Sequence, residues 1–351
     1  MIERPVERIA VLRALHLGDL LLAVPAFRAL RAAYPHAEIS LIGLPWARWF
    51  VERFDGYIDR LIEFSGFPGV LEVEYSAKRA ESAISDLRAE QFDLLIQLHG
   101  SGQTSNRFIA AIAGPETRTA GSFVGERPSF LTVAVPYPSG APEIERNLNV
   151  MRRLGCPDTG SALELPLLPQ DLSEADRLLA PVATRRPLIG LHPGASYPAR
   201  RWAAERFAVV ADRLSERHGA TILLTGGPGE AALAAEVAAR MRAPALNLAR
   251  CTSLGGLAAL IARLDLFISN DTGPAHFANA LDVPSVTIFG PAEFSRWAPL
   301  DRERHIVVRH PVVCSPCPHR VCPIDHRCLH WITPDEVLAA AERQLVKESV
   351  I

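Results

Sequence analysis

The stretch Ser269–Pro291, SNDTGPAHFANALDVPSVTIFGP, follows the apolar run LDLFI and sets out the rhythm of the fold. A polar turn around Gly273 separates this run from a helical pattern, and a second β-rich run ends in Gly-Pro. Strand, turn, helix and strand in this order are typical of a βαβ unit with parallel strands. We expect Gly273 to give the turn its backbone freedom, and Asp271 or Thr272 to cap the helix.

The same alternation of short β-rich runs and longer helical patterns extends over most of the chain, which predicts an α/β protein with parallel sheets. In such sheets, ligands bind at the edge where the strands end. The strand candidates of the first half are RIAVLRA, AEISLIGL, IDRLIEF, FDLLIQLHG and FLTVAVP. Those of the second half are PLIGLHPGAS, ATILLTGGPGE, LDLFISNDTGPAH and VPSVTIFGPAE, each running into a loop with Gly or Pro.

The length of 351 residues predicts two domains. A segment with four prolines, LELPLLPQDLSEADRLLAPVATRRP, interrupts the alternation and is the expected connection. Thr333 and Pro334 predict the N-cap and first position of a last helix. We therefore expect an N-terminal domain over 1–165, a linker over 166–186, a C-terminal domain over 187–332 and a helix over 333–351.

The composition indicates a soluble globular protein, with 48% hydrophobic and 22% charged residues. A net charge of -2 gives no basic field of the kind that nucleic-acid binding needs. The N-terminus lacks a signal-peptide pattern, and no window reaches the roughly 18 uncharged apolar residues of a spanning helix. We expect a cytoplasmic protein whose membrane contact, if any, is peripheral.

Three loops of the second half carry residues suited to a nucleotide ligand. HPGASYPARRW brings two arginines toward the sheet edge, where fixed positive charge compensates a diphosphate leaving group; two solvated arginines beside a core Trp202 are the alternative. The glycines of LTGGPGE allow close approach of a ligand, and Glu230 is a candidate acceptor for ribose hydroxyls. The free N–H groups of the helix after SNDTGPAH suit a phosphate, and a well-made cap is the alternative. The candidate donor-binding residues are His192, Gly194, Ser196, Arg200, Arg201, Gly226, Gly227, Glu230, Asn270, Asp271, Thr272, Gly273 and His276.

A carboxylate stands at the corresponding edge of the first half. Gly18 and Asp19 lie where the first strand turns into the first helix. Asp19 suits a general base that takes a proton from an attacking hydroxyl, and an ordinary helix cap is the alternative. No Walker-type Gly-Lys-Ser/Thr and no Asp-x-Asp pair is present in the sequence.

Together, LGDLLLAVPAFRALRAAYP, HPGASYPARRW, LTGGPGE and SNDTGPAHFANALDVPSVTIFGP resemble glycosyltransferase family 9, the ADP-heptose:lipopolysaccharide heptosyltransferases. The resemblance runs in order from about residue 8 to residue 335. It implies a GT-B fold of two Rossmann-like domains facing across a cleft, with the acceptor on the N-terminal side, the nucleotide-sugar on the C-terminal side and a last helix crossing back.

The resemblance also implies an inverting transfer that needs no metal, with Asp19 at the position of the family's proposed base. Arg200 stands where the family usually has Lys. The implied reaction moves a heptose-type sugar from ADP-heptose to a lipopolysaccharide-core or related glycan, at the inner face of the cytoplasmic membrane. Alternatives are another donor, a protein acceptor, or a protein that binds a nucleotide-sugar without catalysis.

Acceptor contacts are expected in the loop QLHGSGQTSN, where His99, Ser101 and Gln103 are candidates and helix capping is the alternative. The run PWARWFVERF mixes aromatic residues with arginines, so it fits either a membrane-touching helix or an ordinary amphipathic helix packed on its sheet.

Four cysteines, at 314, 317, 322 and 328, crowd into CSPCPHRVCPIDHRC. Their number and softness fit a structural zinc or iron site, with disulfides or free thiols as the alternatives, and the resemblance favours a structural role over a catalytic one.

Overall fold

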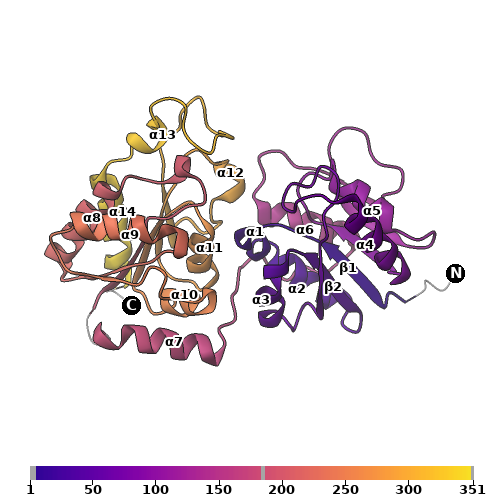
Figure 1. Cartoon of the computed structure of the whole chain (residues 1–351), viewed down its shortest axis with the longest axis horizontal. Helices are drawn as coiled ribbons and strands as arrows, with labels where there is room; N and C mark the ends of the chain where they lie inside the picture. Colours follow the sequence, from indigo (N-terminus) through magenta and orange to yellow (C-terminus); the bar gives the residue numbers. More distant parts are fainter. Residues whose placement is uncertain (1–4, 183–185, 349–351) are drawn as a thin grey trace. The chain divides into compact units, whose positions relative to one another are not determined.

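The computed structural model describes residues 5–182 and 186–348, which divide into two compact units, Met1–Leu163 and Glu164–Ile351 (Figure 1). Each unit contains one six-stranded sheet, and every strand pair in both sheets is parallel. This confirms the predicted α/β class with two Rossmann-like domains.

The first unit has the strand order β3-β2-β1-β4-β5-β6. Its central strand β1 is buried at four of its five positions, as expected of a strand covered on both faces. The strands are β1 Arg8–Leu12, β2 Glu38–Gly43, β3 Arg60–Glu63, β4 Leu94–Gln97, β5 Arg118–Phe123 and β6 Val133–Pro136. The helices are α1 Leu17–Leu21, α2 Val24–Ala33, η1 Pro45–Ala47, α3 Arg48–Arg53, α4 Ala77–Ala89, α5 Ser105–Ile112 and α6 Glu143–Leu154.

The second unit repeats this order as β12-β11-β10-β7-β8-β9. Its strands are β7 Leu188–His192, β8 Thr221–Leu224, β9 Ala245–Asn247, β10 Leu266–Asn270, β11 Ser285–Ile288 and β12 His305–Val308. Its helices are α7 Pro169–Leu179, η2 Ala180–Val182, η3 Pro198–Arg200, α8 Ala204–His218, η4 Pro228–Glu230, α9 Ala231–Arg240, α10 Leu254–Ile261, α11 Gly273–Ala280, α12 Phe294–Trp297, α13 Arg327–His330 and α14 Pro334–Glu348.

The segment between the two sheets contains a helix. Pro169 starts α7, and the Asp171 carboxylate accepts the N–H of Leu168 at 2.9 Å, which caps the first turn. This helix packs along α10, so much of the expected linker belongs to the second unit (Figure 1).

The last helix begins as its sequence predicts. The Thr333 N–H donates to the Glu336 carboxylate at 2.8 Å, and the Glu336 N–H donates back to the Thr333 hydroxyl at 3.3 Å, which is a capping box. Helix α14 packs against α8 and strands β10, β11 and β12 of its own unit. The crossing back to the first unit that the resemblance implies stays a prediction.

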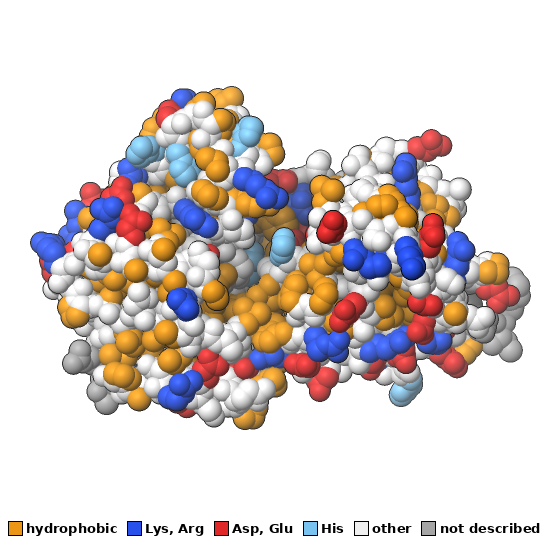
Figure 2. Space-filling model, viewed as in Figure 1, with side chains coloured by type: hydrophobic (Ala, Val, Ile, Leu, Met, Phe, Trp, Pro, Cys, Tyr) orange, Lys and Arg blue, Asp and Glu red, His pale blue; other side chains and the backbone are white. Residues whose placement is uncertain are grey.

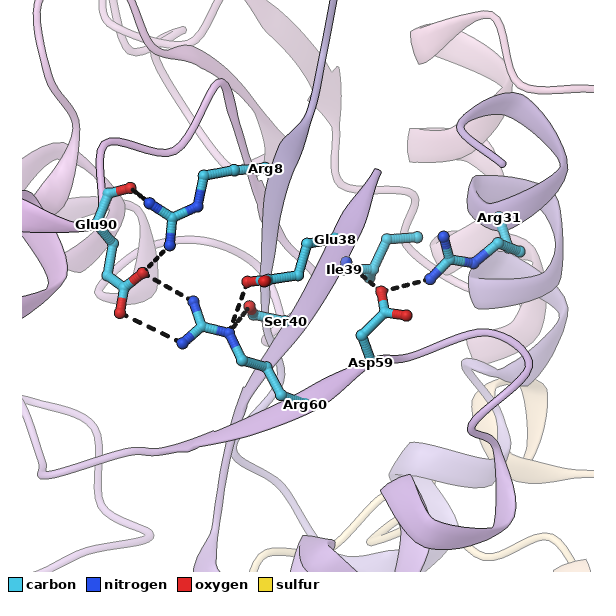
Figure 3. Close-up of polar contacts among 8 residues, drawn as sticks. All are labelled: Arg8, Arg31, Glu38, Ile39, Ser40, Asp59, Arg60 and Glu90. Carbon is cyan, nitrogen blue, oxygen red and sulfur yellow. Dashed lines mark hydrogen bonds and ion pairs between the residues drawn. The ribbon is translucent and has the colours of Figure 1, made fainter. Parts of the chain in front are cut away.

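An ion-pair network joins the amino ends of β1, β2 and β3 (Figure 3). Arg60 lies between two carboxylates, with Nη2 at 2.8 Å from Glu90 Oε2 and Nε at 2.7 Å from Glu38 Oε1, and Arg8 also contacts Glu90. Hydrogen bonding from Arg60 lowers the pKa of Glu90 against the opposing effect of burial. This network holds the strands together at the amino edge of the sheet, which is opposite to the carboxyl edge of the predicted site.

Charges of both signs intermingle on the face drawn in Figure 2. In the part of the chain that the structure describes, no helix combines the length and apolarity needed to cross a membrane. In the segment PWARWFVERF, Phe50 and Phe54 are buried and the Arg53 guanidinium stacks 4.0 Å from the Trp49 ring centroid. Two of its four aromatic side chains therefore belong to the core, as in an ordinary amphipathic helix.

Candidate functional site

Three predicted loops follow β7, β8 and β10, which are neighbours in the second sheet. Since all three strands are parallel, their loops emerge at the same carboxyl edge. Most of the candidate donor-binding residues therefore lie within one small region of this unit.

Asn270, at the end of β10, ties two of these loops together. Its side chain is fully buried, its Oδ1 accepts the N–H of Trp202 at 3.0 Å and its Nδ2 donates to the carbonyl of Pro193 at 2.7 Å. Both ends of the amide are therefore bonded to main-chain groups of the β7 loop. Asn270 therefore supports the carboxyl edge by joining β10 to the β7 loop.

Asp271 is the buried anion of the site. Its carboxylate lies 3.5 Å from Nη1 of Arg200, whose side chain keeps 34% of its surface exposed. Burial raises the pKa of Asp271 from 3.8 to about 6, although the Arg200 charge acts in the opposite direction. The site therefore contains a carboxylate whose burial is energetically unfavourable. Beside it lies an arginine that is 3.5 Å from this carboxylate and partly exposed to solvent.

The amino end of α11 lies next to Asp271. Thr272 occupies the N-cap position in an extended conformation, but its side chain makes no capping hydrogen bond, so the predicted cap is present by position only. His276, one turn along, is buried, and burial lowers its pKa to about 4. A neutral imidazole at pH 7 offers an anion a hydrogen-bond donor rather than a charge.

The β7 and β8 loops meet through His192. Its Nδ1 lies 3.0 Å from the hydroxyl of Thr225, and its Nε2 lies 3.5 Å from Oε2 of Glu230. Burial lowers the pKa of His192, with the Glu230 charge opposing. Thr225, which the sequence analysis did not single out, is a polar residue that directly follows the apolar strand β8, and this position is the signal that identifies it.

The Glu230 side chain closes the turn of the β8 loop with a hydrogen bond and remains partly exposed to solvent. Its Oε2 accepts the N–H of Gly227 at 2.8 Å, while the side chain keeps 20% of its surface exposed. A Cβ added at Gly194 would overlap the Glu230 carboxylate. The glycine of HPGAS is thus required for the packing of this carboxylate, and Gly226 is buried beside it.

The remaining residues of the HPGASYPARRW loop differ in exposure. Arg201 Nε donates to the carbonyl of Ala195 at 2.9 Å and so braces the loop, whereas Ser196 is exposed. Trp202 is buried in the core and donates from its indole to the carbonyl of Ile332 at 3.1 Å. Of the two arginines, Arg200 is the one that extends toward Asp271.

Asp19 is the third residue of α1, a helix of five residues that follows β1. The N-cap of this helix is His16, so Asp19 does not act as its cap. The side chain is half-buried at the carboxyl edge of the first sheet. After β1 the chain forms two helices, α1 and α2, which are separated between Leu21 and Val24.

The candidate acceptor residues follow β4, which pairs directly with β1. His99 Nε2 lies 3.6 Å from the Glu72 carboxylate, and its hydrogen bond lowers the pKa of Glu72. Ser101 is half-buried and Gln103 is exposed. The N-cap of the following helix is Thr104, without a side-chain cap, so none of the three candidates caps it.

The cysteine cluster lines one cavity with Ala199 and His326. All of its cysteines are free thiols, and burial raises the pKa of Cys328 to about 11. Within residues 5–182 and 186–348, no group of three His, Cys, Asp or Glu side chains is arranged to hold a metal ion. The geometry therefore gives the expected zinc or iron no support. Figure 2 shows histidine side chains gathered over this end of the unit, near α13.

Comparison with known proteins identifies the family. The family model described as glycosyltransferase family 9 (heptosyltransferase) matches residues 81–327, which is more than half of the chain. The chain belongs to glycosyltransferase family 9. The family 9 match includes the three donor-side loops and the candidate acceptor loop, and it begins after Asp19.

Two curated relatives are similar to this family 9 protein. Lipooligosaccharide heptosyltransferase 2 of Campylobacter jejuni is 36% identical over 168 residues, and the match spans 46% of this chain and about half (52%) of that protein. Lipopolysaccharide heptosyltransferase 2 of Escherichia coli K12 is 28% identical over 97% of this chain and 99% of its own length.

The fold of this family 9 protein has a solved counterpart. The glycosyl transferase family 9 structure from Veillonella parvula matches with a TM-score of 0.82 and 27% identity over 99% of each chain. With two Rossmann-like units in one chain, this match confirms the predicted GT-B fold.

Proposed function

We propose that this family 9 protein transfers a heptose-type sugar from ADP-heptose to a hydroxyl of a lipopolysaccharide-core or related glycan. The observation that carries the proposal is the contact between the partly exposed Arg200 and the buried Asp271 beside the amino end of α11. The names of the curated relatives support heptose and a lipopolysaccharide-type acceptor. The family resemblance supports ADP.

The donor diphosphate is proposed to bind at this edge of the second sheet. Arg200 supplies positive charge, and the N–H groups of the first turn of α11 and the neutral His276 supply hydrogen bonds. Such groups compensate the negative charge that develops on ADP as its bond to the sugar breaks. The transfer needs no divalent metal in this scheme, because protein cations and donors perform the compensation.

The nucleoside is proposed to lie against the β7 and β8 loops. The Glu230 carboxylate is partly exposed and is held in place by Gly227 and His192. A fixed carboxylate at this position suits the ribose hydroxyls. Arg201 and Asn270 contribute by bracing the loops rather than by touching the donor.

The chemical step is a single displacement. Asp19 takes the proton of the acceptor hydroxyl while the oxygen of that hydroxyl bonds to the anomeric carbon. The bond from that carbon to the diphosphate breaks, and its electron pair goes to ADP. Attack from the face opposite to the leaving group inverts the configuration of the sugar.

The acceptor is proposed to contact the loop after β4, which neighbours the β1 end that carries Asp19. His99, Ser101 and Gln103 are the proposed contacts. The proposed place of action is the cytoplasmic face of the inner membrane, where a glycolipid acceptor requires peripheral access only.

The test is nucleotide selectivity followed by turnover. Calorimetric titration with ADP, UDP and GDP in EDTA is expected to give tight binding for ADP alone. ADP-heptose and a heptose-deficient lipopolysaccharide, followed by mass spectrometry, are expected to give an acceptor heavier by one heptose. A preference for UDP or GDP contradicts the donor. ADP binding without product in prolonged incubations contradicts the enzymatic proposal.

A further inference from the structure

The helix that carries Asp19 is too short to define its own position. Helix α1 contains five residues, and helices of this length are unstable without tertiary contacts. The position of the proposed base therefore depends on groups that hold the backbone of α1 from outside. Two side chains of the first unit do so, and they are Arg13 and Asn147.

Arg13 lies just after β1 and is fully buried. Its Nε and Nη2 donate to the same acceptor, the main-chain carbonyl of Asp19, at 2.8 and 2.6 Å. Its Nη1 donates to the carbonyl of Leu98 and to Oδ1 of Asn147, and its Nη2 also contacts Glu143. The five N–H groups of the guanidinium thus have five acceptor contacts.

The charge of Arg13 is balanced inside the protein. Its Nη2 lies 3.1 Å from Oε1 of Glu143, and side-chain exposure is 0% for Arg13 and 3% for Glu143. Arg146, also buried, lies 3.8 Å from the other oxygen of Glu143. Burying such a cluster is costly, and replacing buried ion pairs by apolar residues is often neutral or stabilising. Stability alone is therefore a weak reason for this arrangement.

Asn147 holds the other end of the same turn. Its Oδ1 accepts from Arg13 at 3.1 Å, and its Nδ2 donates to the carbonyl of Leu22 at 3.1 Å. The carbonyl of Leu22 is therefore held directly from α6, and that of Asp19 is held by Arg13, which is itself bonded to α6. The clamp joins the ends of β1 and β4 to α6 and α1.

We propose that Arg13 is a positioning residue for the transfer reaction: it fixes the main chain at Asp19, so that the carboxylate meets the acceptor hydroxyl in a reactive geometry. This inference rests on the proposed role of Asp19 as the base. Displacement of a catalytic group by about 1 Å costs on the order of 100-fold in rate. Loss of the clamp therefore reduces turnover without removing any group that contacts a substrate.

The test compares Arg13→Met, Arg13→Lys and Asp19→Asn. Arg13→Met leaves Glu143 beside Arg146, so one buried cation still balances the buried anion. We expect kcat to fall about 100-fold, while KM for the donor and Kd for ADP stay within about twofold. Arg13→Lys keeps the charge but lacks the planar fork, so we expect an intermediate loss of about 10-fold.

Hydrogen exchange supplies a readout in the folded enzyme. In Arg13→Met, the amides of Leu20 and Leu22 are expected to lose protection, whereas the sheet amides keep theirs. The matched control is Arg60→Met, which removes an arginine from the ion pairs at the other edge of the same sheet and is expected to keep kcat (Figure 3).

Two results overturn the positioning role. One is a folded Arg13→Met enzyme with wild-type kcat, and the other is a loss of kcat in Arg60→Met as large as that in Arg13→Met. If Arg13→Met unfolds, Arg13→Lys decides in the same way. Failure of the base proposal is separately visible, since Asp19→Asn then keeps its turnover. In an Asp19→Asn background, Arg13→Met is expected to add little further loss.

Discussion

The two edges of the first sheet hold their charges in opposite ways. At the amino edge, Arg60 pairs with Glu90, and their side chains are 35% and 29% exposed. At the carboxyl edge, Arg13 pairs with Glu143, and their side chains are 0% and 3% exposed. Both pairs join segments distant in sequence, but only the second pair is removed from water.

This difference in exposure distinguishes ion pairs that contribute little to stability from buried charges that fix the positions of their neighbours. Exposed ion pairs contribute little, about 0 to 1 kcal/mol, and tolerate loose geometry. Buried charges are costly unless every donor is bonded, and a fully bonded guanidinium holds its neighbours in one arrangement. In the second sheet, Asp271 and His192 are also buried at the carboxyl edge, although His305 is buried at the amino end of β12. Substitutions at the two kinds of edge are therefore expected to have different effects.

The largest expected effect belongs to the proposed base. Asp19→Asn removes the proton acceptor and is expected to reduce turnover by about 10²- to 10⁴-fold. Kd for ADP is expected to stay unchanged, because the loops proposed to bind the donor belong to the second unit. Initial-rate measurements and calorimetry check both statements.

The control for this variant comes from the amino edge. Asp59 accepts the N–H of Ile39 and pairs with Arg31, each at 2.6 Å (Figure 3). Asp59→Asn is expected to retain turnover. Near-normal turnover in Asp19→Asn excludes Asp19 as the base.

The next effect concerns donor affinity. Arg200→Ala removes the partly exposed cation and is expected to raise Kd for ADP by about 10- to 100-fold, as for the loss of a charge-assisted hydrogen bond. Arg200→Lys keeps the charge and is expected to raise Kd only about two- to threefold. Calorimetry measures both variants.

Arg240→Ala is the matched control in the same unit, because Arg240 forms an exposed helix-surface pair with Glu236. It is expected to leave Kd for ADP unchanged. Equal losses in Arg200→Ala and Arg240→Ala contradict a specific phosphate contact.

The third prediction concerns stability against pH. The pKa of Asp271 is about 6 in the folded protein against an ordinary 3.8. Between these pH values the folded state keeps a proton that the unfolded chain has released, so the free energy of unfolding falls as pH rises. The loss is complete above about pH 6 and amounts to about 3 kcal/mol. Asp271→Asn is therefore expected to be more stable than the wild type at pH 8, by up to that amount.

His276 changes the stability with pH in the opposite direction. Its pKa of about 4 lies below the ordinary 6.5, so its contribution is lost as pH falls toward 4. The two groups offset each other in the wild type between about pH 4 and 6. Denaturant titrations of the wild type and of Asp271→Asn at pH 4 and pH 8 separate the contribution of Asp271 from that of His276. If the two proteins differ in free energy of unfolding by the same amount at pH 4 and pH 8, the raised pKa of Asp271 is refuted.

The smallest effect belongs to the amino edge. Arg60→Met breaks pairs that are about one-third exposed, so the free energy of unfolding is expected to fall by no more than about 1 kcal/mol. Turnover is expected to stay within about twofold of the wild type. A larger loss of turnover contradicts the distinction between the two edges.

The sequence predicts the positions of the loops well, because apolar strands such as β7, β8 and β10 are followed by polar turns. It misses β5, β9 and β12. In β5, RTAGSF combines small and polar residues whose burial comes from neighbouring strands. It misses α7, because Pro169 stands at a first helical position rather than inside a loop.

The clamp around Arg13 is also missed by the sequence analysis. Apart from the carbonyl of Asp19, the partners of this arginine lie 85 to 134 positions away in the sequence, and no local pattern shows that its side chain is buried. The sequence predicts Asn270 as a donor-binding residue, but its amide bonds to the β7 loop appear only in the fold. The residues proposed to bind the donor follow from the polar turns that come after apolar strands, whereas the role of a residue that holds other residues depends on contacts that only the fold shows.

The most direct test of the transfer mechanism is the anomeric configuration of the product. ADP-heptose of known configuration and a heptose-deficient acceptor are incubated with the enzyme in EDTA, and the new linkage is assigned by NMR. The account predicts one product with inverted configuration, formed at the same rate as without EDTA. Retained configuration, or a transfer that stops in EDTA, contradicts a single displacement assisted by Asp19 and the protein's own cations.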